Sequence, residues 1–384
     1  MASDKELRLA LVVENFLPIG QVWIWRQLFL DTVVPSIVFA RNRSNEFLYP
    51  WNGVILYNKR GVFFSKVRVR LWFFFKHFYF SLNPKEKTLI RSGIKRFNIV
   101  VLHAHFGTVG CELLDLCREL NVRLIVTFHG FDATAVPKRW PGYSRKLHQL
   151  FKNSFKIIAV SAFIKQKLIE LGCPPEKIDV LYLGVPIPKD KKVYWKDDSK
   201  IRFIHVGSFV EKKGVPDLIR AFSKAFPTSS NVELLLVGDG PERELCRRLI
   251  SELNPANPIL MKDTVPSNLV YQEFLQADVF VLNSRIDSQG TTEGLPIALL
   301  EAQSYGLPVI STLHAGIPEA VSQEGACLVP ERDEESLVSA LRLMVDGDRI
   351  RLMGEASRMF VEGKFNLKEC NRKLERLYHS AVYE

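Results

Sequence analysis

The stretch that decides the fold is "IDSQGTTEGLPIALLEAQSYGLPVISTLHAGIPEAV", residues 286–321. Its glycines and Pro296 indicate a loop, the run that follows is helix-like, and "PVIST" at 308–312 is a short β-branched strand. Loop, helix and strand in this order are typical of parallel α/β sheets. The stretch also carries Glu293 and Glu301, and the role of these two glutamates decides most of what the protein does.

The same alternation of short apolar runs and longer amphipathic stretches continues through all 384 residues, a length for which two domains are expected. Strands are predicted at 7–13, 36–40, 98–104, 123–129, 156–161, 201–207, 232–238, 278–283, 308–312 and 326–330. Helices are predicted near 20–32, 68–80, 84–96, 108–120, 143–153 and 162–171, with a helical tail from 333. The Pro-rich, charged stretch 184–200 is interpreted as a linker between two α/β halves.

Composition excludes several classes of protein. The first residues, "MASDKELRLALVVENF", lack the basic start and long apolar core of a signal peptide, and no apolar run approaches the length of a membrane span. The six cysteines form no CxxC pair, which fits thiols in a reducing compartment better than a disulfide framework or a zinc site. We therefore expect a cytoplasmic protein.

The spacing of the two glutamates separates their possible roles. In a continuous helix Glu293 and Glu301 would stand about 12 Å apart along the axis. The paired carboxylates of a glycosidase must lie about 5–9.5 Å apart, so the spacing excludes that chemistry. With Glu293 in the loop and Glu301 in the helix, both side chains can lean toward the helix amino end and face one elongated ligand such as a nucleotide sugar. The alternative is that both are ordinary solvated charges.

A second candidate lies in "FIHVGSFVEKKGVPDLIRAF", residues 203–222, which combines a strand, a glycine-bearing loop and a helix. Gly207 allows close backbone approach, and Lys212 and Lys213 stand where the helix begins. A diphosphate suits this place because free N–H groups and the helix dipole favour anions. The alternative is a solvated lysine pair at a helix cap. The neighbouring "LLLVGDGPEREL" is not a dinucleotide fingerprint, because Pro241 follows its second glycine.

The histidines of the first half leave alternatives open. His103 and His105 share one strand face, but no acidic or cysteine partner follows nearby, so we expect no metal site. His129 stands at a strand end before Gly130, where a structural role and a role in the site are both possible. Asp132 is a weaker candidate, since it can equally cap the following turn.

Several of these motifs together resemble the retaining glycosyltransferases of family 4. "EGLPIALLE" matches the E-x7-E element of that family, and "GSFVEKKG", "LLLVGDGPE", "ADVFVLNS" and "GLPVISTLHAGIPE" follow its pattern in the same order. "HAHFG" (103–107) and "TFHGFD" (127–132) are similar to motifs of members that build bacterial exopolysaccharide. The resemblance implies an α/β fold of the GT-B type, in which two Rossmann-like domains face each other across a cleft. Residues 1–185 would then form the acceptor-binding domain, joined by the last helix, 366–384, and residues 186–365 would bind the nucleotide sugar.

The resemblance also implies roles for individual residues. Glu293 corresponds to the residue that meets the hydroxyls of the donor sugar, and Glu301 corresponds to the ligand of the ribose. Lys213 corresponds to the lysine that neutralises the diphosphate, and His129 to the histidine near the reacting sugar. Further donor-binding positions are Gly207, Ser208, Lys212, Gly294 and Leu295, and those on the acceptor side are Gly20, His105 and Asp132.

Two positions depart from the family pattern. Ser208 stands where the family usually has an arginine, which removes one fixed charge from the phosphate site. The usual glycine-rich turn after the first strand is "FLPIGQVW" here, with Gly20 alone. The grip on the phosphates and the positioning of the acceptor are the properties that these changes affect.

The implied function is transfer of a sugar, with retention, from a nucleotide-sugar donor to a glycan acceptor in surface polysaccharide synthesis. The mechanism would need neither a cofactor nor a metal, since positive charge and a helix amino end stabilise the leaving diphosphate. A nucleotide-sugar epimerase of the same fold is an alternative. A basic nucleic-acid-binding protein would leave the two glutamates without a role, so we expect no nucleic-acid partner.

The basic charge of the chain is concentrated in one segment. Residues 41–100 hold 13 Lys and Arg against Glu46 and Glu86, although the net charge of the whole chain is only +10. Within this segment, 65–80 interleaves basic residues with aromatic ones in "SKVRVRLWFFFKHFYF". Such a pattern fits binding to an anionic membrane surface, and the alternative is that the aromatic rings pack into the core of the first domain. We expect peripheral attachment to the inner face of the cytoplasmic membrane and a polyprenyl-linked acceptor there.

Overall fold

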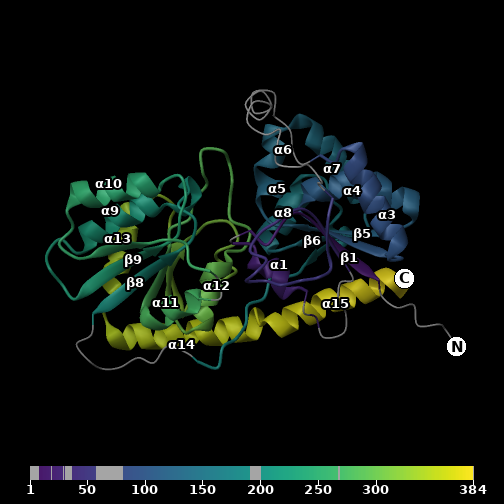
Figure 1. Ribbon diagram of the computed structural model, residues 1–384. Helices are drawn as coiled ribbons and strands as arrows, with labels where there is room; N and C mark the ends of the chain where they lie inside the picture. The colour runs from purple at the N-terminus through teal and green to yellow at the C-terminus, as the bar shows by residue number, and fades with distance from the viewer. Residues whose placement is uncertain are drawn as a thin grey trace. The chain divides into compact units, whose positions relative to one another are not determined.

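A computed structural model describes residues 8–18, 20–28, 30, 37–57, 81–190, 200–266 and 269–383 (Figure 1). The chain forms two compact units. Unit 1 comprises Met1–Tyr182 and Cys370–Glu384, and unit 2 comprises Leu183–Glu369. The last helix, α15 (Leu367–Tyr383), begins in unit 2 and continues into unit 1. The domains predicted from the sequence were 1–185 with 366–384, and 186–365. The predicted helix 68–80, the aromatic segment 65–80 and most of the linker lie outside the described residues.

Unit 1 is built on one parallel sheet of seven strands in the order β3-β2-β1-β4-β5-β6-β7. Its strands are β1 (Leu9–Phe16), β2 (Ile37–Arg43), β3 (Val54–Leu56), β4 (Val101–His105), β5 (Arg123–Phe128), β6 (Lys156–Ala159) and β7 (Ile178–Val180). Its helices are α1 (Val22–Arg26), α3 (Pro84–Arg96), α4 (Gly107–Leu120), α5 (Phe131–Thr134), α6 (Val136–Arg139), α7 (Pro141–Asn153) and α8 (Ala162–Glu170), with a 3-10 turn at Pro175–Lys177.

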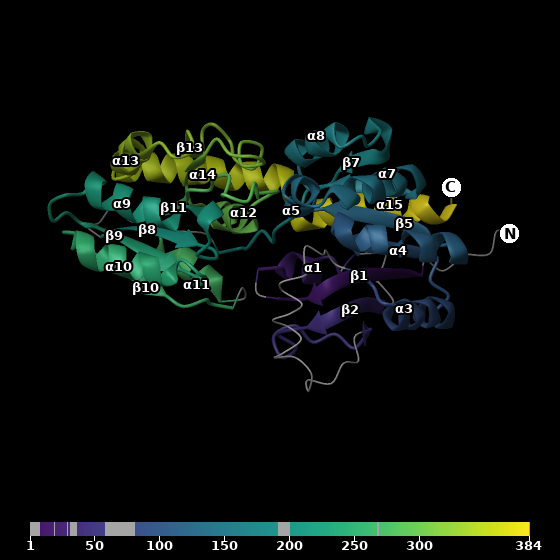
Figure 2. The same ribbon diagram turned by 90° about the horizontal axis from the view of Figure 1, so that it is seen from above.

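The helices of unit 1 cover both faces of its sheet, with α3, α4 and α7 on one face and α1 and α15 on the other (Figure 1). Figure 2 shows α3 lying beside β1 and β2. The contact is close because Gly93 of α3 has no Cβ, and a Cβ there would approach the ring of Phe39 on β2 to 2.5 Å. The start of α3 is fixed by a capping box, in which the Asn83 side chain accepts from Glu86 N and the Glu86 side chain accepts from Asn83 N.

Unit 2 repeats the architecture with six parallel strands in the order β10-β9-β8-β11-β12-β13. The strands are β8 (Ile201–Val206), β9 (Val232–Val237), β10 (Ile259–Lys262), β11 (Val279–Leu282), β12 (Val309–Thr312) and β13 (Ala326–Val329). The helices are α9 (Val215–Ala225), α10 (Arg243–Leu253), α11 (Val270–Gln276), α12 (Ile297–Ser304), α13 (Glu334–Leu343) and α14 (Gly347–Lys364), with a 3-10 turn at Glu211–Lys213.

The core of unit 2 lies between this sheet and its helices. In Figure 1, α9, α10 and α13 cover one face of β8 and β9, and α11, α12 and α14 lie on the other face. Helix α9 shows why the sequence folds this way, because Leu218, Ile219 and Phe222 recur at helical spacing and are fully buried. Phe222 makes an edge contact with Phe203 of β8, with 5.8 Å between the ring centroids.

Every strand that the sequence predicts is present, as are three helices in the tail. Three short strands were not predicted: β3, β7 and β10, with three, three and four residues. Each lies at an edge of its sheet and is short, so that it buries few side chains and has only a weak apolar pattern in the sequence. The helix expected near 20–32 is shorter, since α1 covers only Val22–Arg26.

In both sheets the strand order changes direction after the first strand of the unit. The sheet of unit 1 reverses its order between β1 and β4, and that of unit 2 reverses between β8 and β11. In parallel α/β sheets, ligands bind outside the carboxyl ends of the strands at such a switch point. The loops that begin at Leu17, Phe106, Gly207 and Asn283 follow these four strands, and the candidate residues gather in and around these loops.

Candidate active site

The two lysines and Glu293 meet at the switch point of unit 2. The Nζ of Lys213 lies 2.7 Å from Oε1 of Glu293, and the Nζ of Lys212 lies 3.8 Å from Oε2. Ser284, which follows β11, donates from its hydroxyl to Oε1 at 3.2 Å. Glu293 is only 6% exposed, so it is not an ordinary solvated charge. The structure thus brings together two sets of residues that the sequence presented in separate motifs.

The charges of this cluster support one another. Burial alone would raise the pKa of Glu293, but Lys213 and Lys212 outweigh burial and lower it to about 2. Burial lowers the pKa of Lys213 and the neighbouring Lys212 lowers it further, whereas Glu293 opposes both effects. We expect the Lys213–Glu293 pair to be ionised near neutral pH. The cluster of two lysines and one glutamate then has one excess positive charge, that of Lys212.

The lysine loop is held against the strand next to it. Gly214 takes a φ of +58°, and a Cβ on it would lie 2.3 Å from the backbone oxygen of Asn283. Only glycine fits both the conformation and the space. The side chain of Asn283 donates to Gly214 O at 3.2 Å, and Arg285 N donates to Lys212 O at 2.8 Å. These bonds place the two lysines over the end of β11.

The second glutamate lies where the sequence predicts it. Glu301 is in the second turn of α12, and Glu293 is in the loop before that helix. Gly294 and Leu295 are buried between them. The residue at the start of α12 is Pro296, which supplies no side-chain cap, and the first turn contains no acidic residue. Its amino end therefore has no side-chain cap of its own, which is the arrangement that an anionic ligand can use.

Below the lysine loop lies a histidine that the sequence analysis did not single out. His205 of β8 is fully buried, its Nδ1 lies 3.1 Å from Val281 O, and its Nε2 has no hydrogen-bond partner among the described residues. Burial and the nearby Lys213 lower its pKa to about 4. Gly207 lies directly above, since a Cβ there would be 3.2 Å from this Nε2. Ser208, which replaces the usual arginine, is exposed.

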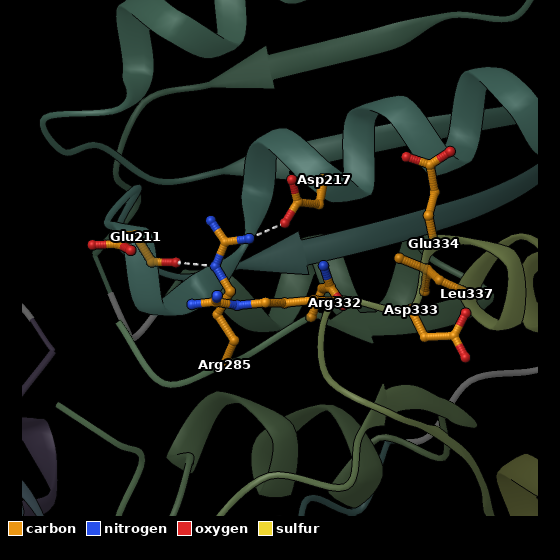
Figure 3. A pocket seen from close by; sticks show the side chains of 8 residues that line it. Glu211, Asp217, Arg285, Arg332, Asp333, Glu334 and Leu337 are labelled. Carbon is orange, nitrogen blue, oxygen red and sulfur yellow. Dashed lines mark hydrogen bonds and ion pairs between the residues drawn. The ribbon is translucent and has the colours of Figure 1, made fainter. Parts of the chain in front are cut away.

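A separate hollow of about 340 Å³ lies between the amino ends of α9 and α13. Figure 3 shows Arg285 pointing to Asp217 and to the backbone oxygen of Glu211, and each of these groups accepts a hydrogen bond from it. Asp333 and Glu334 also line the hollow. Of its two arginines, Arg285 is paired with Asp217 and Arg332 donates to the backbone oxygen of Ile286, and none of the predicted donor-binding residues lines the hollow. The hollow is therefore not the candidate diphosphate site.

The site of unit 1 is built from neutral rings. His105 at the end of β4 and His129 after β5 lie side by side, with 3.3 Å between His105 Nδ1 and His129 Nε2. Trp23 of α1 packs on His129 with 4.2 Å between ring centroids. Phe106, whose ring centroid is 4.7 Å from that of His129, takes a φ of +76°. Such a backbone is rare for a bulky residue, and strain of this kind often marks a functional site.

A second buried network lies behind these rings. Nδ1 of His103 is 2.6 Å from the hydroxyl of Tyr378 on α15, and its Nε2 is 2.7 Å from the hydroxyl of Thr127. Burial lowers the pKa of both His103 and His129 to about 3. The pKa of His105 is also well below its ordinary value, because of burial and its two histidine neighbours. All three rings are therefore neutral at physiological pH.

Asp132 forms a backbone clamp in this site. Its carboxylate accepts from Gly107 N at 2.8 Å and from His129 N and Gly130 N at 3.0 Å each. Burial raises its pKa to about 6, although these hydrogen bonds oppose the shift. The capping role left open by the sequence is thus seen, and it joins the start of α4 to the loop of His129. Contact of Asp132 with an acceptor stays a prediction, as it does for the exposed Gly20.

Two features are absent from the described residues. In the described parts of the chain, no group of three or more His, Cys, Asp or Glu side chains could hold a metal ion. No helix within the described ranges is both long and apolar enough to cross a bilayer.

Sequence reasoning missed six residues that the structure places in or behind the two sites: Trp23, His205, Ser284, His314, Glu331 and Tyr378. A signal existed for two of them. His314 and Glu331 closely follow the ends of β12 and β13, as His129 follows β5. Because the carboxyl ends of parallel strands meet at one edge of the sheet, polar residues there are candidates for the site. Tyr378 lies 275 positions from its partner His103, and no local pattern connects them.

Comparison with known families gives two matches that together cover most of the chain. Residues 186–361 match the model described as glycosyl transferases group 1, and residues 36–188 match that of glycosyltransferase family 4. The border between the two matches lies within the stretch 184–200 that was interpreted as a linker.

The chain is similar to bacterial glycosyltransferases of polysaccharide biosynthesis. It is 32% identical over 285 residues to the colanic acid biosynthesis glycosyltransferase WcaL of Escherichia coli, covering 72% of this chain and 70% of that protein. It is 28% identical over 295 residues to the amylovoran biosynthesis glycosyltransferase AmsK of Erwinia amylovora, with 74% and 71% covered.

Among solved structures, HepE of Anabaena in complex with UDP-glucose superimposes with a TM-score of 0.76 at 14% identity. The match covers 97% of this chain and 99% of that one. At such low identity the likeness concerns the fold, and it is a fold of two Rossmann-like domains of the GT-B type, as the sequence predicts.

Proposed function

This chain belongs to the glycosyltransferases of family 4, and we propose that it transfers a sugar, with retention, from a nucleotide-sugar donor to a glycan acceptor. The relatives named for colanic acid and amylovoran biosynthesis support a role in the assembly of a surface polysaccharide. The complexes of HepE with UDP and UDP-glucose support a nucleotide sugar as the donor. An epimerase or a nucleic-acid-binding protein finds no such support.

The observation that carries the proposal is the cluster of Lys212, Lys213 and Glu293 before the uncapped start of α12. A diphosphate needs positive charge and free N–H groups, and the lysines and the helix amino end supply both. A sugar next to the diphosphate needs an acceptor for its hydroxyls, and the carboxylate of Glu293 supplies that. Glu301, one turn into α12, is the candidate partner of the ribose.

In the structure Lys213 binds Glu293, so the carboxylate occupies the place that a phosphate would take on the ammonium group. When a donor binds, the Lys213 ammonium is shared between phosphate and Glu293, or turns to the phosphate. The positive charge then stabilises the nucleoside diphosphate as the bond to the sugar breaks. We propose that this step is independent of metal, since the two lysines and the helix amino end provide the positive charge.

Unit 1 is proposed to bind the acceptor. The half-buried ring of His129 can offer a hydrogen-bonding nitrogen to an uncharged sugar hydroxyl, and the buried His105 and Trp23 pack against this ring and hold it in place. A neutral imidazole can accept a proton from a hydroxyl or donate a hydrogen bond to it. His129 is the partly exposed member of the pair, and we assign it the contact with the reacting sugars.

We further propose that the acceptor is carried on a polyprenyl lipid and that segment 65–80 binds the anionic inner surface of the membrane. The sequence of that segment supports this, although it lies outside the described residues. The protein should float with anionic vesicles and detach when salt is added. Each basic residue near the surface should contribute about 1 kcal/mol to the binding free energy. Replacing Arg68, Arg70 and Lys76 by glutamine should abolish flotation. Equal flotation on neutral lipid would contradict the proposal.

A donor screen tests the central proposal. Thermal unfolding is measured with common UDP-, GDP- and ADP-sugars, and a true donor at 100-fold its Kd should add about 2.7 kcal/mol of stability. Transfer from that donor to a lipid-linked glycan is then measured with and without EDTA, and we expect the same rate in both. If no sugar nucleotide stabilises the protein and no sugar is transferred, the proposed function is wrong.

A further inference from the structure

We propose that His314 and Glu331 are positioning residues that hold the backbone of Glu293 in place for the donor sugar. The inference rests on the proposed function, because it assumes that Glu293 meets that sugar. His314 lies in the motif "GLPVISTLHAGIPE", to which no site residue was assigned from the sequence, and Glu331 lies outside all the motifs. Both closely follow strands at the carboxyl edge of the sheet of unit 2, β12 and β13.

The contacts form a continuous chain. Glu293 N donates to Nε2 of His314 at 3.1 Å, and Nδ1 of the same ring lies 2.6 Å from Oε1 of Glu331. The side chain of His314 is 1% exposed and that of Glu331 is 25% exposed. Water therefore cannot easily replace the imidazole as the partner of the Glu293 amide.

These contacts define one state of the ring. Nε2 accepts a hydrogen bond from a backbone N–H, so this nitrogen carries no proton. The proton of the neutral ring is then on Nδ1, which donates to the carboxylate of Glu331. Glu331 thus selects the tautomer of His314 that can hold Glu293. Carboxylates play the same role behind histidines in metal sites and catalytic triads.

Glu331 also fixes the other end of the same loop. Its Oε2 accepts from Ile286 N at 2.9 Å, and Arg332 donates to Ile286 O at 3.0 Å. Figure 3 shows Arg332 extending beside Arg285, the residue before Ile286. The loop from Ile286 to Glu293 is therefore tied at its beginning by Glu331 and at its end by His314.

The tie matters because the Glu293 side chain has little freedom to compensate for a displaced backbone. Its Oε1 contacts Lys213 and Ser284, and the backbone oxygen of Ser284 accepts from Thr312 Oγ1 at 2.5 Å. A shift of the Glu293 amide moves the carboxylate relative to the sugar but leaves the lysines and Glu301 in place. A misplacement of about 1 Å can lower turnover about 100-fold.

Three variants test the inference. His314→Leu removes the acceptor and keeps an apolar side chain, and we expect kcat to fall about 10- to 100-fold. The Kd of the free nucleoside diphosphate, measured by isothermal titration, should stay within about twofold, because the diphosphate contacts lie elsewhere. His314→Gln retains an acceptor near the position of Nε2 and should recover most of the lost rate. Glu331→Gln should reduce kcat, whereas the exposed Glu324→Gln is the matched control and should not.

The tautomer is read independently of activity. In ¹⁵N-histidine NMR spectra of the full-length protein, His314 should show a protonated Nδ1 and an unprotonated Nε2, and Glu331→Gln should weaken this preference. A proton on Nε2 in the wild type overturns the inference, even in a preparation that transfers no sugar. So does unchanged kcat in folded His314→Leu, or an equal loss in His314→Gln. If the wild type shows the expected tautomer but neither binds nor uses any sugar nucleotide, the proposed function fails, and with it the assigned purpose of the tie.

Discussion

The two switch points of the molecule have the same strand topology but carry different side chains, charged in unit 2 and mostly uncharged in unit 1. The site of unit 2 is ionic, with Lys212 and Lys213 on a buried carboxylate. The site of unit 1 is built mainly from the uncharged rings of His105 and His129 beside aromatic side chains, and its carboxylate, Asp132, is bound by backbone N–H groups. This difference supports the proposal that the first site binds a charged diphosphate and the second an uncharged sugar hydroxyl. Electrostatics, and not architecture, distinguishes the two halves.

Lowering the pH should have the largest effect, because it should destabilise the unit with the uncharged histidines, unit 1. The pKa values of the three buried histidines of unit 1 are depressed, so only the unfolded chain gains their protons as pH falls below about 6.5. Asp132, with its raised pKa, acts in the opposite direction. Its contribution to the stability of the folded state is complete below about pH 4 and is lost as pH rises through 6. The histidines prevail by number, and unit 1 should lose about 5 kcal/mol between pH 6.5 and 4.

Urea titrations at several pH values, followed by tryptophan fluorescence, measure this loss. Five of the six tryptophans precede residue 183, so the signal reports mainly on unit 1. His105→Asn should flatten the dependence on pH, Asp132→Asn should steepen it, and the exposed His148→Asn serves as the control. A pH-independent midpoint would show that these rings are not neutral in the folded protein.

Removing the buried cation of unit 2 should have the next largest effect. Lys213→Ala leaves Glu293 without its closest partner, and breaking a buried pair costs about 3–5 kcal/mol. Affinity for the nucleoside diphosphate should also fall about 10- to 100-fold, because a hydrogen bond to a charged group is lost. Thermal melting and isothermal titration measure the two effects. Lys212→Ala is the matched control with smaller effects, since its Nζ is 3.8 Å from the carboxylate and its side chain is 26% exposed. A reversed order would assign the phosphate to Lys212.

Within the site of unit 2, the two glutamates should differ in their effects on binding and on turnover. Glu301→Ala should weaken binding of the nucleoside diphosphate about 10-fold, since the ribose loses its partner. Glu293→Ala should leave this affinity unchanged or tighten it, because Lys213 is released from its ion pair, yet turnover should fall. Titration calorimetry and kinetics give the two values, after circular dichroism has shown that both variants fold. Equal losses of affinity would remove the assignment of sugar to one glutamate and ribose to the other.

The smallest effect is expected behind the site of unit 1. Tyr378→Phe leaves Nδ1 of the buried His103 without its partner, at a cost of about 1–3 kcal/mol. For a unit of this size that corresponds to a Tm lower by about 2–4 °C per kcal/mol. Tyr383→Phe on the same helix is the control, because that side chain is 64% exposed. Equal melting of both variants would mean that water or another group replaces the phenol.

Much of the fold could be predicted because its signal is local. Alternating apolar runs located the strands inside both sheets and the edge strand β13, and helical spacing located α9 and the tail helices. The short outer strands β3, β7 and β10 escaped, since they bury few residues. The placement of Glu293 in a loop and Glu301 in α12 also followed from the positions of glycine and proline.

The sequence by itself determined the class of fold, the family and the residue types available at the ends of the strands, because periodicity and motif spacing are properties of neighbouring residues. Only the tertiary structure decided which of these residues meet. It paired Lys213 with Glu293 across 80 positions, joined His103 to Tyr378, and placed His314 and Glu331 behind Glu293. The physical reason is that a parallel sheet gathers distant strand ends at one edge, and burial there fixes the charge state of each group.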